Sequence, residues 1–368
     1  MEMKGFAVIG AGNAGCAIAA DMTLAGFEVN LFEFPQFEER FERILDEQAI
    51  MITGEGNEGR ADLHLATTNL QEAIRDIQLI LVSIPAFGHA TLAQELAPLL
   101  REDHVVVFIP GGFGSFVFLN ALKAVKPKGK IIVGETATLP YAARLSGPNE
   151  VHVFLKAILN PFASIPVDRT ESLAKDLRRL YPEITPAQDV LDVALNNLNP
   201  SIHPVPSILS TSRVELADEF WLYREGMTAS VEKVMVALDN ERIAVREAAG
   251  YGPPHYDLKK SEGSECFEDY FGKGGKVKAG HNLKGPLDMK ERYVTEDIPY
   301  GLVFFASLGD KLGIDTPIMD AIINIASVIN GADYAREGLN LERLGLQDLS
   351  LNEIKQRIRH GTSSTTSR

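Results

Sequence analysis

The chain has 368 residues and a formal net charge of −14, with two cysteines and one tryptophan. At roughly 150 residues per domain, this length corresponds to about two domains. Its hydrophobic fraction of 45% and charged fraction of 23% are ordinary for a globular protein. They exclude a largely disordered chain, a collagen-like repeat and a coiled coil.

Charge and cysteine usage narrow the expected surroundings and partners. Cys16 and Cys266 cannot form a disulfide framework, and no leader pattern precedes the first strand, so we expect a cytoplasmic protein. No run of 18 apolar residues predicts a membrane span. An acidic chain is a poor partner for nucleic acid, although a local arginine can still bind an anionic substrate. No metal site is predicted.

The first 150 residues alternate between strand and helix patterns. Their apolar runs of Val, Ile and Leu predict parallel strands covered by helices on both faces, so the fold class is α/β. Residues 151–186 mix strands with a helix at 168–180. The preceding strands are predicted at 5–9, 28–32, 79–84, 104–109 and 130–133, and the helices at 13–25, 35–48, 89–100 and 115–125.

After about residue 188 the pattern becomes mainly helical. Residues 252–300 lack periodicity and are dense in Gly, Lys, Asp, Glu and Pro, which is typical of a functional loop. We therefore predict domains at 1–187 and 188–360, followed by a disordered tail at 361–368. Helices of the second domain are predicted at 189–210 with proline interruptions, at 212–251 as one long element, at 303–329 as two helices split at 313–317, and within 341–360.

A glycine-rich turn follows the first strand and opens the first helix, with the sequence Gly10-Ala-Gly12-Asn13-Ala14-Gly15. In such a turn the first glycine permits the tight bend, the second admits a pyrophosphate, and the third lets the helix pack on the sheet. The helix N-terminus at Asn13 and Ala14 offers N–H groups to phosphates. This context favours a dinucleotide-binding site; the alternative is a glycine turn that binds no ligand.

The ends of the next strands add candidate cofactor contacts. Glu33 ends the second strand, where a carboxylate binds ribose hydroxyls and repels a 2′-phosphate. NAD is therefore the expected cofactor, with NADP as the alternative if Arg40 or Arg43 folds back. Pro85 and Ala86 follow a buried strand and are predicted to line the cofactor, since ligands bind beyond such strand ends. The alternative for this pair is an ordinary turn.

His203 is the histidine with the most distinctive surroundings, in the segment 196–204. Asn199 lies four residues earlier, on the same face of a helix. Pro200 and Pro204 disrupt the backbone hydrogen bonds nearby, which destabilises a helix and so suggests a functional reason for the prolines. Histidine titrates near neutral pH and suits acid–base catalysis, while a hydrogen-bonded core histidine is the alternative. Asp297, in the polar cluster 292–301, is either a carboxylate partner or a helix cap.

The chain resembles the opine dehydrogenases, the NAD/NADP octopine and nopaline dehydrogenase group. The specific motifs are Asn-x-x-x-His-Pro at 199–204 and Arg-Tyr-x-x-Glu-Asp at 292–297. The similarity covers nearly the whole chain before the Ser/Thr tail. Its further segments are 7–15, 84–89, 134–136, 198–206, 285–286, 301–303, 316–317, 337–338 and 344–346.

The resemblance implies an N-terminal Rossmann domain, a C-terminal helical domain and an active site in the cleft. It also implies NAD(P)H-dependent reductive condensation of an amino acid with a 2-oxo acid such as pyruvate. Position by position, His203 matches the catalytic histidine and Asp297 its carboxylate partner. Asn199 matches a substrate-binding asparagine, and Arg292 an arginine that reaches the cofactor pyrophosphate. Glu135 falls beside a segment that shapes the amino-acid pocket.

Two alternatives stay open. The first is a reductase of the ketopantoate or glycerol-3-phosphate dehydrogenase kind, which usually relies on a lysine in the second domain. Lys233, in an ordinary amphipathic pattern, does not favour it. The second is a non-catalytic NAD-binding sensor, because a fold alone does not prove activity. Small molecules are the expected partners, and the apolar helices after Val303 slightly favour a homodimer.

Overall fold

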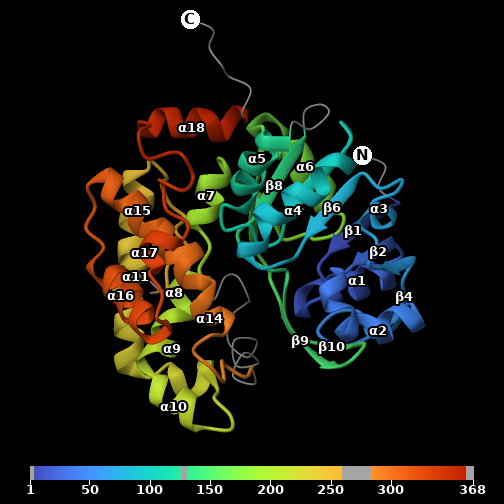
Figure 1. Cartoon of the computed structure of the whole chain (residues 1–368), viewed down its shortest axis with the longest axis horizontal. Coiled ribbons are helices and arrows are strands. Elements are labelled where there is room, and N and C mark those ends of the chain that lie inside the picture. The colour runs from blue at the N-terminus through green and yellow to red at the C-terminus, as the bar shows by residue number, and fades with distance from the viewer. Residues whose placement is uncertain (1–3, 126–130, 259–282, 362–368) are drawn as a thin grey trace, which may run out of the picture. The chain divides into compact units, whose positions relative to one another are not determined.

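The chain divides into two compact units in the computed structural model, which describes residues 4–125, 131–258 and 283–361 (Figure 1). The first unit is Met1–Val193 with Arg357–Arg368, and the second is Ala194–Gln356. The division falls inside helix α7 (Val190–Leu195), a few residues after the predicted boundary. The end of the last helix belongs to the first unit, which differs from the predicted range of 188–360. Residues 362–368 of the predicted tail lie outside the described residues.

The first unit is built on a sheet of eight strands, in the order β12-β11-β8-β7-β6-β1-β2-β5. Neighbours are parallel except where β11 meets β8, so the predicted α/β class is confirmed. The strands of this sheet are β1 (Gly5–Ile9), β2 (Glu28–Phe32), β5 (Leu65–Thr67), β6 (Leu79–Val82), β7 (Val105–Phe108), β8 (Ile132–Thr136), β11 (Asn160–Ile165) and β12 (Ile184–Pro186).

Helices of the first unit alternate with these strands. Beyond α7 they are α1 (Asn13–Leu24), η1 (Pro35–Phe37), α2 (Glu38–Glu47), α3 (Leu70–Ala73), η2 (Ala86–Gly88), α4 (His89–Leu96), η3 (Ala97–Leu99), α5 (Gly114–Val125), η4 (Val167–Arg169) and α6 (Thr170–Leu177). The predicted alternation of strand and helix in the first part of the chain is therefore confirmed.

A second sheet, absent from the sequence prediction, has the order β4-β3-β10-β9. Its strands are β3 (Ala49–Gly54), β4 (Gly59–Asp62), β9 (Tyr141–Gly147) and β10 (Glu150–Lys156). Buried and exposed side chains mix along β3, β9 and β10, so these strands lack the continuous apolar runs that reveal the main sheet.

Helix α1 packs between the two sheets and contacts β1 and β2 on one side and β3, β4, β9 and β10 on the other. Its residues are buried without interruption from Gly15 to Met22. The small side chains of this stretch let both sheets approach closely. The helix that follows the glycine turn is therefore fixed on two sides.

Asp21 ties α1 to the second sheet. Its carboxylate accepts hydrogen bonds from the Tyr141 hydroxyl at 2.6 Å and from the Lys156 ammonium at 2.8 Å. Burial opposes ionisation of this carboxyl group, but these bonds hold the pKa of Asp21 below its ordinary value. The contact secures the helix whose N-terminus carries the glycine turn.

The second unit consists of helices in its described residues. In Figure 1, α11, α15, α16 and α17 lie together; α11, α15 and α16 contact one another, and α17 contacts α16. No helix in the described ranges is long and apolar enough to cross a membrane. The helices are α8 (Asn199–Ile202), α9 (Pro204–Leu209), α10 (Thr211–Leu216), the π-helical turn η5 (Leu222–Gly226), α11 (Ala229–Ala248), α14 (Arg292–Thr295), the π-helical turn η7 (Asp297–Leu302), α15 (Val303–Leu312), α16 (Pro317–Asn330), α17 (Tyr334–Glu337) and α18 (Leu351–His360), whose last residues belong to the first unit.

The prediction of one helix over 212–251 is wrong. The chain leaves α10 at Ala217, whose backbone is extended at φ −105° and ψ 146°, and the next α-helix begins only at Ala229. The π-helical turn η5 lies between them. The predicted split at 313–317 is confirmed, because Gly313 ends α15 in the left-handed conformation at φ 72°.

Buried arginines organise the interior of the second unit. Arg242 is fully buried and donates to the Asp239 carboxylate at 2.7 Å and to the Leu195 carbonyl at 2.6 Å. Arg246 donates to the Gly252 carbonyl at 2.6 Å. These bonds hold the segment before α8 and the chain after α11 against the same helix. Part of the predicted loop at 252–300 lies outside the described residues.

Candidate active site

The glycine turn has a different constraint at each of its glycines. Gly10 adopts φ +99°, and a Cβ atom there would lie 2.7 Å from the Ser83 carbonyl oxygen. A Cβ atom on Gly15 would lie 1.8 Å from the Gly10 carbonyl oxygen. A Cβ atom on Gly12 would meet nothing within 4 Å. The outer two glycines thus close the turn, and the middle one leaves open the approach that a pyrophosphate needs.

Helix α1 begins at Asn13, so the N–H groups of its first turn are not used by the helix itself. The side chain of Asn13 accepts a hydrogen bond from the N–H of Leu145 at 2.8 Å. Its amide oxygen is therefore used in the protein, while the backbone at Asn13 and Ala14 forms the helix N-terminus. This combination fits the binding of a dinucleotide phosphate.

Glu33 lies beside the turn, after the end of β2. Its carboxylate accepts hydrogen bonds from the N–H of Ala11 at 3.1 Å and from the N–H of Phe34 at 2.9 Å. Burial raises the pKa of Glu33, although these bonds favour the carboxylate. Pro85 and Ala86 follow β6 and are half-buried. Because β1, β2 and β6 are parallel neighbours, the predicted cofactor residues of the first unit gather at one edge of the sheet.

Glu135 has a structural role that the sequence prediction did not include. Its fully buried carboxylate accepts hydrogen bonds from the N–H groups of Phe113 and Ser115, both at 2.9 Å, and from the Ser115 hydroxyl at 2.6 Å. Burial raises its pKa to about 7. The side chain caps the start of α5, and direct contact with a substrate would require these bonds to open.

His203 is the centre of a hydrogen-bonded cluster in the second unit. Its Nδ1 atom lies 2.8 Å from a carboxylate oxygen of Asp297, and its Nε2 atom lies 3.0 Å from the hydroxyl of Tyr223. The ring of Tyr293 meets the imidazole edge-on, with centroids 4.6 Å apart. The side chains of His203 and Asp297 are only 15% and 14% exposed. We call these four residues the His203 site.

Two short helices position the imidazole. His203 ends α8 and precedes α9, and its N–H donates to the Asn199 carbonyl at 3.0 Å. Asn199 and His203 therefore have the predicted helical spacing. The Ser207 hydroxyl donates to the His203 carbonyl at 2.7 Å. Pro200 lies in the first turn of α8, where its missing N–H is harmless.

Close packing brings Asp297 to His203. Pro200 lies against Gly301 of η7, where a Cβ atom would come within 2.2 Å of the proline ring. Asp297 is the first residue of η7, whose N-cap position is Glu296, and its carboxylate contacts the imidazole. Of the two interpretations left by the sequence, the geometry favours the carboxylate partner. The glycine in the segment 301–303 thus has a packing role for the site.

Arg292 lies on α14, next to Tyr293. It pairs with Glu296 one helical turn later, and its side chain is 63% exposed. It makes no contact with His203 in the described hydrogen bonds. Its predicted role at the cofactor would require it to exchange Glu296 for a phosphate, which an exposed guanidinium can do.

Tyr223 was not identified from the sequence. It lies on η5, within the region that the sequence pattern predicted as one long helix. On such a helix it would carry no distinguishing signal. The segment Trp221-Leu-Tyr-Arg-Glu-Gly226 does end in a glycine, which weakens a helix and is the only local sign of an interruption.

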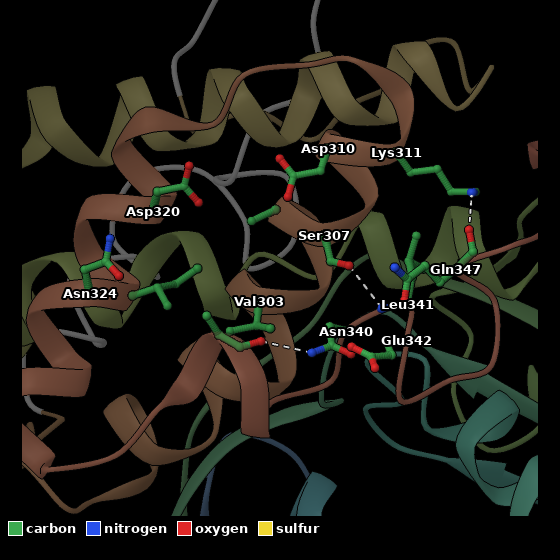
Figure 2. A pocket seen from close by; sticks show the side chains of 13 residues that line it. Val303, Ser307, Asp310, Lys311, Asp320, Asn324, Asn340, Leu341, Glu342 and Gln347 are labelled. Atoms are coloured by element: carbon green, nitrogen blue, oxygen red, sulfur yellow. Dashed lines mark hydrogen bonds between the residues drawn. The ribbon is translucent and has the colours of Figure 1, made fainter.

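A cavity of about 700 Å³ lies elsewhere in the second unit, between α15, α16 and residues 335–347. Figure 2 shows three carboxylates around it, those of Asp310, Asp320 and Glu342. No member of the His203 site lines this cavity. It is therefore a separate feature of the helical unit.

The His203 site has the geometry of a general acid–base. A carboxylate at Nδ1 holds the proton on that nitrogen and stabilises the imidazolium form. Nε2 is then the nitrogen that can exchange a proton with a bound group. The imidazole–carboxylate pair therefore supports proton transfer.

Comparison with known proteins finds one family match in each part of the chain. Residues 5–152 match the family described as NAD-dependent glycerol-3-phosphate dehydrogenase N-terminus. Residues 186–330 match the family described as NAD/NADP octopine/nopaline dehydrogenase, alpha-helical domain. The chain therefore has an N-terminal Rossmann-like NAD-binding domain followed by a helical domain.

Full-length relatives agree with these matches. An opine dehydrogenase of Arthrobacter sp. (strain 1C) is 29% identical over 97% of this chain and 99% of its own. A solved structure of octopine dehydrogenase with NADH and agmatine has a TM-score of 0.69 at 18% identity, covering 99% of each chain. A ketopantoate reductase from Ralstonia eutropha JMP134 has a TM-score of 0.59 at 16% identity, covering 89% of this chain and 98% of its own. Residues 186–330 thus match the helical domain of the octopine/nopaline dehydrogenase family, and the chain is similar to an opine dehydrogenase over nearly its whole length.

Proposed function

We propose that the chain catalyses the NAD(P)H-dependent reductive condensation of an amino acid with a 2-oxo acid such as pyruvate. The observation that carries the proposal is the hydrogen bond between Nδ1 of His203 and Asp297, residues 94 positions apart in the sequence. Each lies in one of the two motifs specific to the family. This pair supplies the proton transfers that imine formation requires.

The glycine turn and Glu33 would hold the cofactor. The open side of Gly12 admits the pyrophosphate, and the Glu33 carboxylate favours NAD by repelling a 2′-phosphate. Pro85 and Ala86 line the same edge of the sheet. Arg292 would bind the pyrophosphate after releasing Glu296. When bound, the nicotinamide supplies the hydride that reduces the imine.

His203 and Asp297 would manage the protons of the condensation. Protonated His203 polarises the carbonyl of the 2-oxo acid and donates a proton as the carbinolamine loses water. In the oxidative direction, neutral His203 removes a proton from the secondary amine. Asp297 holds the ring orientation and stabilises the imidazolium in both directions. Asn199, one helical turn before His203, is proposed to bind the substrate.

The test is NADH oxidation with pyruvate and other 2-oxo acids against a panel of amino acids. The proposal predicts oxidation only when an amino acid and a 2-oxo acid are both present. Repeating the assay with NADPH measures the cofactor preference. In the reverse direction, lactate or another 2-hydroxy acid should not reduce NAD⁺, because the reacting bond is the CH–NH bond. Oxidation without any amine would contradict the proposal.

A hydroxy acid reductase is the second candidate, because the fold is shared with ketopantoate reductase. That reaction reduces the 2-oxo acid alone, so the amine requirement separates the two. Lys233, the lysine considered for that chemistry, is exposed on α11 and makes no contact with His203 among the described bonds. A non-catalytic NAD sensor would bind NADH without oxidation by any pair.

We also propose that the protein is cytoplasmic, acts on small-molecule substrates and forms a homodimer. The reducing cytoplasm suits Cys16, a buried free thiol. Light scattering of the purified chain at several concentrations measures the mass directly. A monomer at all concentrations would contradict the dimer without bearing on the reaction.

A further inference from the structure

The hydroxyl of Tyr223 occupies the position next to the reactive nitrogen of His203. It lies 3.0 Å from Nε2, while Nδ1 is bound to Asp297 at 2.8 Å. The proposed function requires Nε2 to exchange a proton with the substrate. A substrate oxygen could reach Nε2 directly only by displacing this hydroxyl.

The backbone that carries Tyr223 is pinned in place. Leu222 is fully buried, and a Cβ atom on Gly226 would lie 3.0 Å from the ring of Phe220. The Phe220 carbonyl accepts a hydrogen bond from the N–H of Gly285 at 2.7 Å. Glu225 pairs with Arg213 at 2.9 Å. Single π-helical turns such as η5 are rare in proteins, and those that occur are often found at functional sites.

A tyrosine hydroxyl can both donate and accept hydrogen bonds. With neutral His203 protonated on Nδ1, Nε2 accepts the hydroxyl proton of Tyr223. With protonated His203, Nε2 donates to the tyrosine oxygen, and the hydroxyl proton turns toward another acceptor. The pair can therefore pass a proton through the hydroxyl without moving either ring.

We propose that Tyr223 relays the proton between His203 and the departing oxygen of the substrate; this rests on the proposed function. As the carbinolamine loses water, the Nε2–H bond breaks and a new O–H bond forms on Tyr223. The original proton of Tyr223 forms an O–H bond on the substrate hydroxyl. The C–O bond breaks, its electron pair leaves with water, and the nitrogen lone pair forms the C=N bond. His203 ends neutral, Tyr223 ends unchanged, and the substrate becomes an iminium ion.

Tyr223→Phe tests the relay, because it keeps the ring and removes only the hydroxyl. Tyr334→Phe is the matched control: its hydroxyl accepts a hydrogen bond from Asn330 at 2.9 Å, outside the His203 site. We expect Tyr223→Phe to lower kcat about 10- to 100-fold with an unchanged KM for NADH. The control keeps wild-type kinetics. Circular dichroism confirms that both variants fold.

The rate in mixtures of H₂O and D₂O separates a relay from simple positioning. Two protons moving together give a curved dependence on deuterium content in the wild type, whereas Tyr223→Phe gives a straight one. A kcat within twofold of wild type overturns the relay. A lower kcat with the curvature retained also overturns it, and leaves Tyr223 as a positioning residue.

A measurement on the ligand-free protein tests the hydrogen bond itself. In ¹⁵N NMR of histidine-labelled protein, with His203 neutral, losing the Tyr223 hydroxyl shifts the Nε2 resonance downfield. Tyr334→Phe leaves it in place. An unchanged resonance in Tyr223→Phe overturns the relay even if turnover changes. Wild-type protein without turnover for any amine and 2-oxo acid overturns the proposed function, and the relay with it.

Discussion

The glycine turn of the first unit and the His203 site of the second unit are assembled in opposite ways. The turn is one contiguous segment, Gly10–Gly15, whose shape depends on its own backbone and one neighbouring strand end. The His203 site joins three segments of the chain, with Tyr223 20 residues and Asp297 94 residues from the histidine. A contiguous site depends on local geometry, while an assembled site depends on the packing of the whole unit.

The difference also concerns what each site tolerates. The turn has no spare room at Gly10 or Gly15 but is open at Gly12. The His203 site depends on the contact between Pro200 and Gly301, which contains no catalytic group. Changes in the turn should therefore act on cofactor binding, and changes in the His203 site on turnover.

Replacing His203 by alanine makes the strongest test of this separation. We expect kcat to fall about 10²- to 10⁴-fold, since general acid–base catalysis contributes that much. The dissociation constant for NADH, measured by fluorescence titration, should stay at the wild-type value. His64→Ala, an exposed histidine of the first unit, serves as the matched control. Wild-type turnover in His203→Ala would remove His203 from the mechanism.

Two alanine substitutions in the turn separate folding from binding. Gly15→Ala puts a methyl group 1.8 Å from the Gly10 carbonyl oxygen and should lower the free energy of unfolding by about 1–3 kcal/mol or more. Gly12, with φ −76° and no atom near its Cβ position, accepts alanine without strain. Gly12→Ala should therefore keep its stability and weaken NADH binding about tenfold or more. Denaturant titration and fluorescence titration measure the two effects. Full NADH affinity in Gly12→Ala would contradict the proposed approach of the pyrophosphate.

Glu135 provides a test within the first unit that is independent of catalysis. Its carboxyl group titrates near 7 in the folded protein but near 4.5 when unfolded. The unfolded state therefore loses this proton first, and the free energy of unfolding falls as pH rises between these values, by roughly 1.4 kcal/mol per pH unit. Glu135→Gln should flatten this part of the curve. Urea titrations from pH 4.5 to 7 measure the free energy of unfolding of both proteins. Parallel curves against pH would contradict the raised pKa of Glu135.

The smallest expected effect concerns cofactor choice. Glu33→Ser removes a charge near the proposed ribose position and should improve the affinity for NADPH relative to NADH by about tenfold, the effect of one lost repulsion. Binding titrations with both nucleotides measure the ratio. Glu28→Ser, at the exposed start of the same strand, is the control. An unchanged ratio would place the 2′ position away from Glu33.

The sequence predicted β1, β2, β6, β7 and β8 of the main sheet, mostly from their apolar runs, but it did not predict the short strand β5. The strands 5–9 and 28–32 are correct to the residue. The second sheet was missed, since its strands mix buried and exposed side chains and only pack against α1 in the folded unit. The helix predicted over 212–251 was wrong because helical periodicity continues across η5, where the chain changes direction.

The candidate site was predictable in part. His203 and Asn199 could be identified from the sequence by their spacing of four residues and by the surrounding prolines. Asp297 required the family resemblance, because 50 acidic residues offer no distinguishing pattern. Tyr223 was not predictable, since an isolated tyrosine in an amphipathic stretch has no motif. Glu135 was predicted beside the substrate, whereas its carboxylate caps α5.

The sequence by itself indicated the α/β class, the dinucleotide turn, the resemblance to the opine dehydrogenases and the histidine proposed as the acid–base. These follow from short segments whose chemistry is set by neighbouring residues. The resemblance implied Asp297 as the carboxylate partner of His203, and only the tertiary structure decided which hydroxyl meets Nε2. Those contacts depend on η7 packing on α8 and η5 packing on α9, and packing between distant segments leaves no regular spacing in the chain.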